Sequence, residues 1–107
     1  MTEPIPSPIT ALIEATNTGD EDRFVGTFTA DARVEDGGRV FLGHEGVARW
    51  NLTDNIGVGM HFDLIACVAS SEGTYDVTLR ATSRRFSGTG TMRLTLKDGR
   101  ISSLVIG

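Results

Sequence analysis

The sequence predicts a single α+β domain in which helices cover one face of a curved antiparallel sheet. In the first half of the chain apolar residues recur at helical spacing, in the second half they alternate with polar residues, and short turn signals join the alternating segments. Short links favour antiparallel neighbours, and helices that precede a run of strands are typical of α+β domains. At 107 residues the chain can form one hydrophobic core but is too short for a second catalytic domain.

Two helices are expected in the first 30 residues. Residues 1–6 are expected to be flexible, after which Ser7 can cap a helix that has Pro8 at its first position and ends by Gly19. Asp20 can cap a second helix. The buried stripe of this second helix is expected to be formed by Phe24, Val25 and Phe28.

A short hairpin and a third helix follow. Residues 36–38, Asp-Gly-Gly, are a turn signal between two short alternating segments, of which the second is residues 39–42. Because both strands are short, we expect this hairpin at the periphery of the sheet. A third helix is expected over residues 44–55, with Val47 and Trp50 on one side.

Four longer strands are expected at residues 60–70, 74–83, 86–96 and 100–106. The second and third of them alternate clearly, so that one face is apolar and the other is rich in Thr and Arg. That polar face is the expected surface of a homodimer and carries Thr78, Arg80, Thr82, Thr89, Thr91, Arg93 and Thr95. Gly88 and Gly90 would permit a bend or bulge in the third of these strands.

Composition argues against several classes of protein. Ten Lys and Arg against 14 Asp and Glu give a net charge of -4, so the positive surface that nucleic acids require is missing. No apolar run reaches about 18 residues and no basic-then-apolar N-terminus is present, so we expect no membrane span, no signal peptide and a cytoplasmic location. Cys67 lies alone in an apolar run, which predicts a buried, inert thiol. His44 and His61 lie far apart without a ligand cluster, so no metal or other cofactor is expected.

Several short motifs follow one another in a characteristic order along the chain. They are Thr18-Gly19-Asp20, Phe28-Thr29-Ala30-Asp31-Ala32, Val34-Glu35-Asp36, Gly43-His44-Glu45-Gly46-Val47 and Asp98-Gly99-Arg100-Ile101. Together they cover nearly the whole chain, which resembles the nuclear transport factor 2-like superfamily and, within it, the SnoaL-like and ketosteroid isomerase-like groups. The resemblance implies a cone-shaped fold: three N-terminal helices on a strongly bent antiparallel sheet, a cavity between them, and commonly a homodimer through the sheet. Because this fold hosts isomerases, cyclases, epoxide hydrolases, dehydratases and proteins that only bind, it does not by itself predict the chemistry.

Asp36 is the one residue expected to be catalytic. In the resemblance it matches the general base of ketosteroid isomerase-like enzymes, which work with a tyrosine and a protonated aspartic acid. The matching positions here hold Leu12 and either Met92 or Thr91, so authentic steroid isomerisation is not expected. The other interpretation of Asp36 is a turn residue whose carboxylate accepts hydrogen bonds from turn amides.

The cavity is expected to be lined by Leu12, Thr16, Phe24, Phe28, Phe41, Trp50 and Met92. We therefore expect a small, largely apolar organic molecule to bind there and to undergo cofactor-independent isomerase or cyclase chemistry, with Asp36 as base. The alternative is a non-catalytic ligand-binding or dimerisation module whose cavity is filled by apolar side chains. An epoxide hydrolase-like mechanism would need an Arg and a second Asp inside the cavity, and the sequence places neither there.

Overall fold

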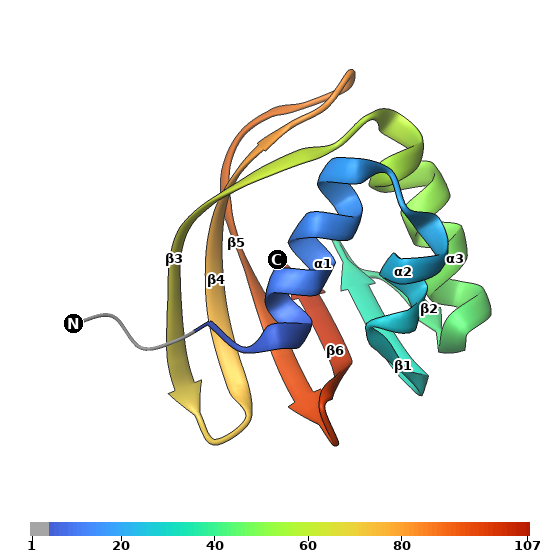
Figure 1. The fold of residues 1–107 in the computed structure, drawn as a ribbon. Coiled ribbons are helices and arrows are strands. Elements are labelled where there is room, and N and C mark those ends of the chain that lie inside the picture. The colour runs from blue at the N-terminus through green and yellow to red at the C-terminus, as the bar shows by residue number, and fades with distance from the viewer. Residues whose placement is uncertain (1–4) are drawn as a thin grey trace.

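The computed structural model describes residues 5–107, in which three α-helices and one short 3-10 helix pack on one curved six-stranded sheet (Figure 1). The elements are α1 (Ser7–Thr18), α2 (Glu21–Gly26), β1 (Phe28–Asp36), β2 (Arg39–Leu42), α3 (Gly43–Asp54), η1 (Ile56–Val58), β3 (His61–Ser71), β4 (Thr74–Thr82), β5 (Ser87–Lys97) and β6 (Arg100–Ile106). The predicted α+β class, with three helices on a bent sheet, is confirmed. The flexible N-terminus predicted over residues 1–6 falls mostly on residues 1–4, which lie outside the described part of the chain.

The sheet has the order β2-β1-β6-β5-β4-β3. Its neighbours are antiparallel except for β1 and β6, which pair in parallel with Val34 opposite Leu104. The sequence predicts the β1-β2 hairpin at the periphery, but only β2 lies at the edge. The reason is that β1 carries the fully buried residues Phe28, Ala32 and Val34, and β6 returns beside it to complete the inner face.

The bend of the sheet coincides with irregular pairing at several places. Register shifts occur on β3 between Leu64 and Ala66, and between β5 and β6 at Thr95. Such irregularities increase local twist and bend a strand. The register of β4 with β5 continues unbroken through Gly88 and Gly90, so the bulge that these glycines would permit does not form.

The start of α1 differs from the prediction. Ser7 lies inside the helix and makes no side-chain cap, because the cap position is Pro6, whose carbonyl oxygen accepts from the amides of Ile9 at 3.0 Å and Thr10 at 3.2 Å. The predicted cap of α2 is confirmed, since the amide of Arg23 donates to Asp20 Oδ1 at 3.1 Å.

Phe28 was predicted in the second helix but begins β1. The chain leaves α2 at Thr27, whose hydroxyl donates to the carbonyl of Phe24 at 2.7 Å, while its own carbonyl accepts from the amide of Ile101 on β6 at 2.8 Å. This last bond pairs the chain with β6, so that Phe28 continues as a strand residue. The third helix, the second hairpin strand and the four long strands lie within one residue of their predicted bounds.

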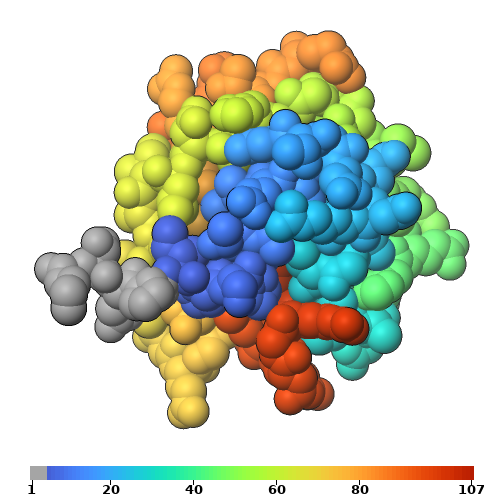
Figure 2. All heavy atoms as spheres, in the orientation of Figure 1, coloured from blue at the N-terminus to red at the C-terminus, as the bar shows by residue number. Residues whose placement is uncertain are grey.

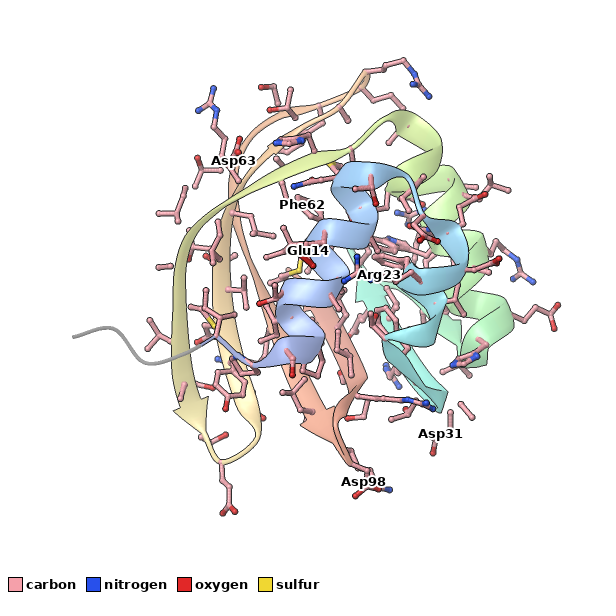
Figure 3. All side chains as sticks on the ribbon, in the orientation of Figure 1. Glu14, Arg23, Asp31, Phe62, Asp63 and Asp98 are labelled. Atoms are coloured by element: carbon pink, nitrogen blue, oxygen red, sulfur yellow. The ribbon has the colours of Figure 1, made fainter. Side chains whose placement is uncertain are left out.

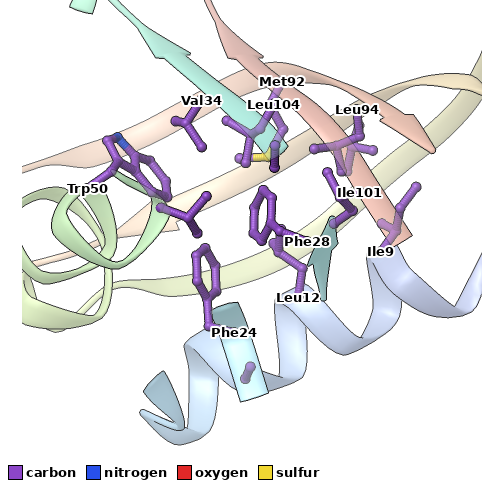
Figure 4. Close-up of a cluster of buried hydrophobic side chains, with 14 of the residues drawn as sticks. Ile9, Leu12, Phe24, Phe28, Val34, Trp50, Met92, Leu94, Ile101 and Leu104 are labelled. Carbon is purple, nitrogen blue, oxygen red and sulfur yellow. The ribbon is translucent and has the colours of Figure 1, made fainter. Parts of the chain in front are cut away.

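The hydrophobic core lies between the helices and the inner face of the sheet (Figure 4). The ring of Phe24 contacts those of Phe28 and Trp50, with centroids 5.3 and 6.1 Å apart. Helices α1 and α2 cover the sheet on the side seen in Figure 2, and Arg23 of α2 donates to Glu14 of α1 at 2.9 Å (Figure 3).

The outer face of β4 and β5 is polar, as predicted. The hydroxyls of Thr78 and Thr91 lie 3.0 Å apart, and Arg93 pairs with Asp76 at 2.9 Å. Cys67 is half-buried, and burial raises the pKa of its thiol, which disfavours the reactive thiolate. None of the helices in residues 5–107 has the length and apolar character needed to cross a membrane.

Candidate active site

A cavity of about 490 Å³ lies between the C-terminal end of α3 with η1 and the inner face of the sheet. Its apolar wall includes Val58, Met60, Phe62, Leu79, Met92 and Ile106. Its lining also includes the polar residues Asp36, Asp54, Asn55, Ser83 and Arg85. A largely apolar cavity of this size with a few polar groups is typical of small-molecule sites.

Asp36 lies at the last position of β1, and one of its carboxylate oxygens is held by two donors. Trp50 Nε1 donates to Asp36 Oδ2 at 2.9 Å, and Arg39 Nη2 donates to the same oxygen at 3.1 Å. Within residues 5–107, neither Oδ1 nor Oδ2 accepts from a turn amide; the amide of Gly37 donates instead to the carbonyl of Ile106. The side chain is 23% exposed. The carboxylate is thus oriented by side chains from β2 and α3, unlike that of an ordinary turn residue.

Arg39 also joins Asp36 to a second carboxylate, that of Asp54. Its guanidinium donates to both oxygens of Asp54, at 2.9 and 3.3 Å, and Thr53 Oγ1 adds a bond of 2.6 Å. The hydrogen bond from Arg39 is the largest cause of a lowered pKa for Asp54, so this group is ionised near neutral pH. Asp36 and Asp54 line the cavity, whereas Arg39 is not among the lining residues and its side chain is 53% exposed.

This Asp-Arg-Asp arrangement was not foreseen from the sequence. Arg39 faces Asp36 across the hairpin, a relation that the turn signal could have indicated. Asp54 reaches the same guanidinium only because the C-terminal end of α3 packs beside the hairpin, which is a contact between distant parts of the chain.

The structure brings three of the predicted site residues to the cavity: Asp36, Trp50 and Met92. The other five lie elsewhere: four belong to the packed region formed by α1, α2 and the start of β1, and Phe41 lies on the edge strand β2. Leu12, Phe24 and Phe28 belong to the closed core, and Thr16 lies behind the cavity wall, where its hydroxyl accepts from Asn55. Phe41 lies on β2, with the guanidinium of Arg39 5.5 Å from its ring centroid.

Sequence reasoning missed Asn55 and Arg85 on the cavity wall and the opening at Gly90. Gly90 pairs with the buried Leu79, so it occupies a position on the inner face of β5 where a side chain would point into the cavity. A Cβ built there meets nothing within 4 Å. A glycine on the apolar face of an alternating strand could therefore have predicted open space at this position.

Comparison with known proteins identifies the family. The profile of the SnoaL-like domain matches residues 9–104. The chain belongs to the SnoaL-like domain family. No curated protein sequence matches this SnoaL-like domain.

Several solved structures share its fold. A protein from Sinorhizobium meliloti, proposed to be a polyketide cyclase, is 26% identical with a TM-score of 0.87, and the match covers 96% of this chain and 95% of that one. A proposed ketosteroid isomerase from Kribbella flavida is 16% identical with a TM-score of 0.79, covering 94% and 73%. The epoxide hydrolase/cyclase-like enzyme SalBIII is 20% identical with a TM-score of 0.80, covering 94% and 86%. The predicted superfamily is thereby confirmed, and the last two similarities concern the fold alone.

Proposed function

We propose that this SnoaL-like domain binds a small, largely apolar organic molecule in the cavity and catalyses a cofactor-independent proton transfer on it, with Asp36 as the base. The observation that carries the proposal is the carboxylate of Asp36 on an apolar cavity wall. Its Oδ2 is fixed by Trp50 and Arg39, whereas Oδ1 accepts no hydrogen bond from residues 5–107. A general base needs a fixed position and an oxygen within reach of the proton that it removes.

The chemistry that fits is the removal of a proton from a carbon beside a carbonyl group. Asp36 Oδ1 takes the proton, and the electrons of the C–H bond move to the carbonyl oxygen as an enolate. In an isomerase, Asp36 returns the proton to another carbon. In a cyclase, the enolate carbon attacks a second carbonyl of the same molecule, and the resulting alkoxide takes the proton. Arg85 also lines the cavity, and its guanidinium, whose Nη1 donates to the carbonyl oxygen of Thr53 at 3.4 Å, is the positive group that we propose to stabilise the oxyanion.

The proposed cyclase activity of the Sinorhizobium meliloti relative supports this reaction class. A second candidate is the opening of an epoxide, supported by the Asp36-Arg39-Asp54 arrangement and by the fold shared with SalBIII, which is linked to pyran ring formation. That reaction needs one carboxylic acid to protonate the epoxide oxygen as its C–O bond breaks. Because the pKa of Asp54 is lowered, this group is a weak source of that proton, and the structure favours proton transfer by Asp36.

The alternative of a non-catalytic module with a filled cavity receives less support. Met92 lies on the cavity wall but leaves about 490 Å³ open, and Leu12 is in the core. The homodimer through the outer face of the sheet stays a prediction, which sedimentation velocity can test.

The test is hydrogen-deuterium exchange into bicyclic apolar ketones in D₂O, followed by NMR, with the wild type and Asp36→Asn. We expect exchange by the wild type and a loss of about 100-fold or more in the variant, the usual contribution of a general base. Asp31→Asn is the matched control, because Asp31 lies on the same strand but is exposed and remote from the cavity lining. Exchange that persists undiminished in Asp36→Asn would refute Asp36 as the base.

A further inference from the structure

Within residues 5–107, Arg85 is the one cationic residue that lines the cavity. It is exposed, so a molecule that enters the cavity can reach its guanidinium. It forms no ion pair with any residue of this range, and its side chain makes a single hydrogen bond, from Nη1 to the carbonyl oxygen of Thr53 at 3.4 Å. Most of its N–H donors are therefore available to a ligand.

The two carboxylates of the cavity, those of Asp36 and Asp54, are paired with a different cation. Arg39 donates to Asp36 at 3.1 Å and to Asp54 at 2.9 and 3.3 Å. The pKa of Asp54 is lowered chiefly by the hydrogen bond from Arg39, with the charge of Arg85 as the smallest contribution. Of the three charged side chains that line the cavity, Arg85 is thus the one without an oppositely charged partner in contact among residues 5–107.

The loop that carries Arg85, residues 83–86, is fixed by hydrogen bonds within itself and to η1. Ser83 Oγ accepts from the amides of Arg85 at 3.2 Å and Phe86 at 3.0 Å. Arg84 donates to two carbonyl oxygens of η1, from its amide at 3.0 Å and from its Nη2 at 2.7 Å. None of these bonds involves the side chain of Arg85. The loop therefore holds Arg85 at the cavity and does not depend on its guanidinium.

The surroundings of this guanidinium favour a carboxylate as its ligand. A cation beside apolar walls has lost part of its hydration, and a negatively charged group on a ligand replaces the lost interaction. A planar guanidinium matches a carboxylate well, because its N–H groups can donate to both oxygens at once. The neighbouring Phe86 is 56% exposed and also lines the cavity, so an apolar surface adjoins the cation. This combination suits an apolar molecule that carries an anionic group.

We propose that Arg85 binds a carboxylate of the molecule in the cavity, so that the ligands of this site are ionised apolar carboxylic acids. Together with the enolisable carbonyl on which Asp36 acts, the substrate class is an apolar keto acid, and this combination rests on the proposed function for the carbonyl alone. A guanidinium that holds a carboxylate through two N–H groups has others that can donate to the oxyanion of the proposed reaction. Recognition of the carboxylate needs only the cavity and Arg85.

The test compares 2-naphthoate with 2-naphthol, which has the same apolar rings but is uncharged at pH 7. We expect the wild type to bind 2-naphthoate about tenfold more tightly than 2-naphthol, because hydrogen bonds between charged groups are strong. In Arg85→Gln the ratio of the two affinities should fall to about one. Methyl groups of Met60 and Met92 labelled with carbon-13 report by NMR whether each probe enters the cavity.

Arg80→Gln is the matched control. Arg80 is an exposed residue of β4 that does not line the cavity, and its replacement changes the net charge of the protein by the same amount. This variant should keep the preference for 2-naphthoate. An equal loss in both variants would show that the preference reflects net charge and would overturn the proposal.

Other outcomes also count against the proposal. It is wrong if neither probe binds, if the wild type does not prefer 2-naphthoate, or if the preference survives in Arg85→Gln. Binding of 2-naphthoate that leaves both methionine methyls unshifted would place the carboxylate outside the cavity. Because 2-naphthoate has no proton on the carbon beside its carboxylate, its binding is independent of proton transfer. Failed ketone exchange with Arg85-dependent binding of 2-naphthoate would therefore refute only the proposed reaction.

Discussion

Gly90 gives the sharpest test of the cavity, because filling it should stabilise the protein while removing its function. Gly90 lies on the inner face of β5 opposite Leu79, and a Cβ at this position would meet nothing within 4 Å. Its φ lies outside the left-handed region, so a larger residue can take the same backbone conformation. Gly90→Leu therefore adds a side chain to the cavity without backbone strain.

Two effects determine the size of the stabilisation. Replacing a glycine whose conformation suits other residues gains about 0.4–1 kcal/mol by restricting the unfolded chain. A leucine side chain that is half-buried against Leu79 and its neighbours adds roughly 1 kcal/mol, about half the value for full burial. We expect a gain of about 1.5 kcal/mol, which corresponds to a rise in melting temperature of about 5–10 °C.

Thermal unfolding followed by circular dichroism measures the stability, and titration with 2-naphthol measures binding. Ser87→Leu is the matched control, because it adds a leucine at an exposed position of the same strand that faces away from the cavity. It should change neither quantity appreciably. A Gly90→Leu protein that is less stable than the wild type, or one that still binds 2-naphthol normally, would show that the space at Gly90 is not the binding cavity.

Two further predictions concern the polar contacts around the site. Arg39→Gln should destabilise the protein at pH 7, because Arg39 lowers the pKa of Asp54 in the folded state. The stabilisation is present at pH values above the ordinary carboxyl pKa and is lost as the pH falls through the pKa of Asp54 in the folded protein. The difference in stability between variant and wild type should therefore shrink below about pH 4. Urea unfolding from pH 7 to pH 3 checks this, and a constant difference would contradict it. Asn17→Ala should cost about 1–2 kcal/mol, because the Asn17 amide pairs with both the N–H and the C=O of Phe62 on the edge strand β3, at 2.7 and 2.9 Å. Faster amide exchange at Phe62 should accompany the loss, and unchanged exchange would argue against this role.

The sequence by itself determined most of the secondary structure. Helical and alternating periods act over a few residues, so the local pattern was enough to place the four long strands and the third helix within one residue. The errors occur where a contact from elsewhere decides the outcome. Phe28 has the spacing of a helical residue, yet the amide of Ile101 on β6 donates to the carbonyl of Thr27 and pairs the chain with the sheet at this point.

The candidate site could be predicted only in part, because it also depends on contacts between distant parts of the chain. Asp36 could be chosen from its place at the end of a strand before a turn, and Trp50 from its helical face. The partnership of Asp36 with Trp50 and Arg39 and the link to Asp54 arise from the packing of α3 against the hairpin. A cavity is the space that packed elements leave unfilled, and the tertiary structure decides where it lies because no single segment of the chain encloses it.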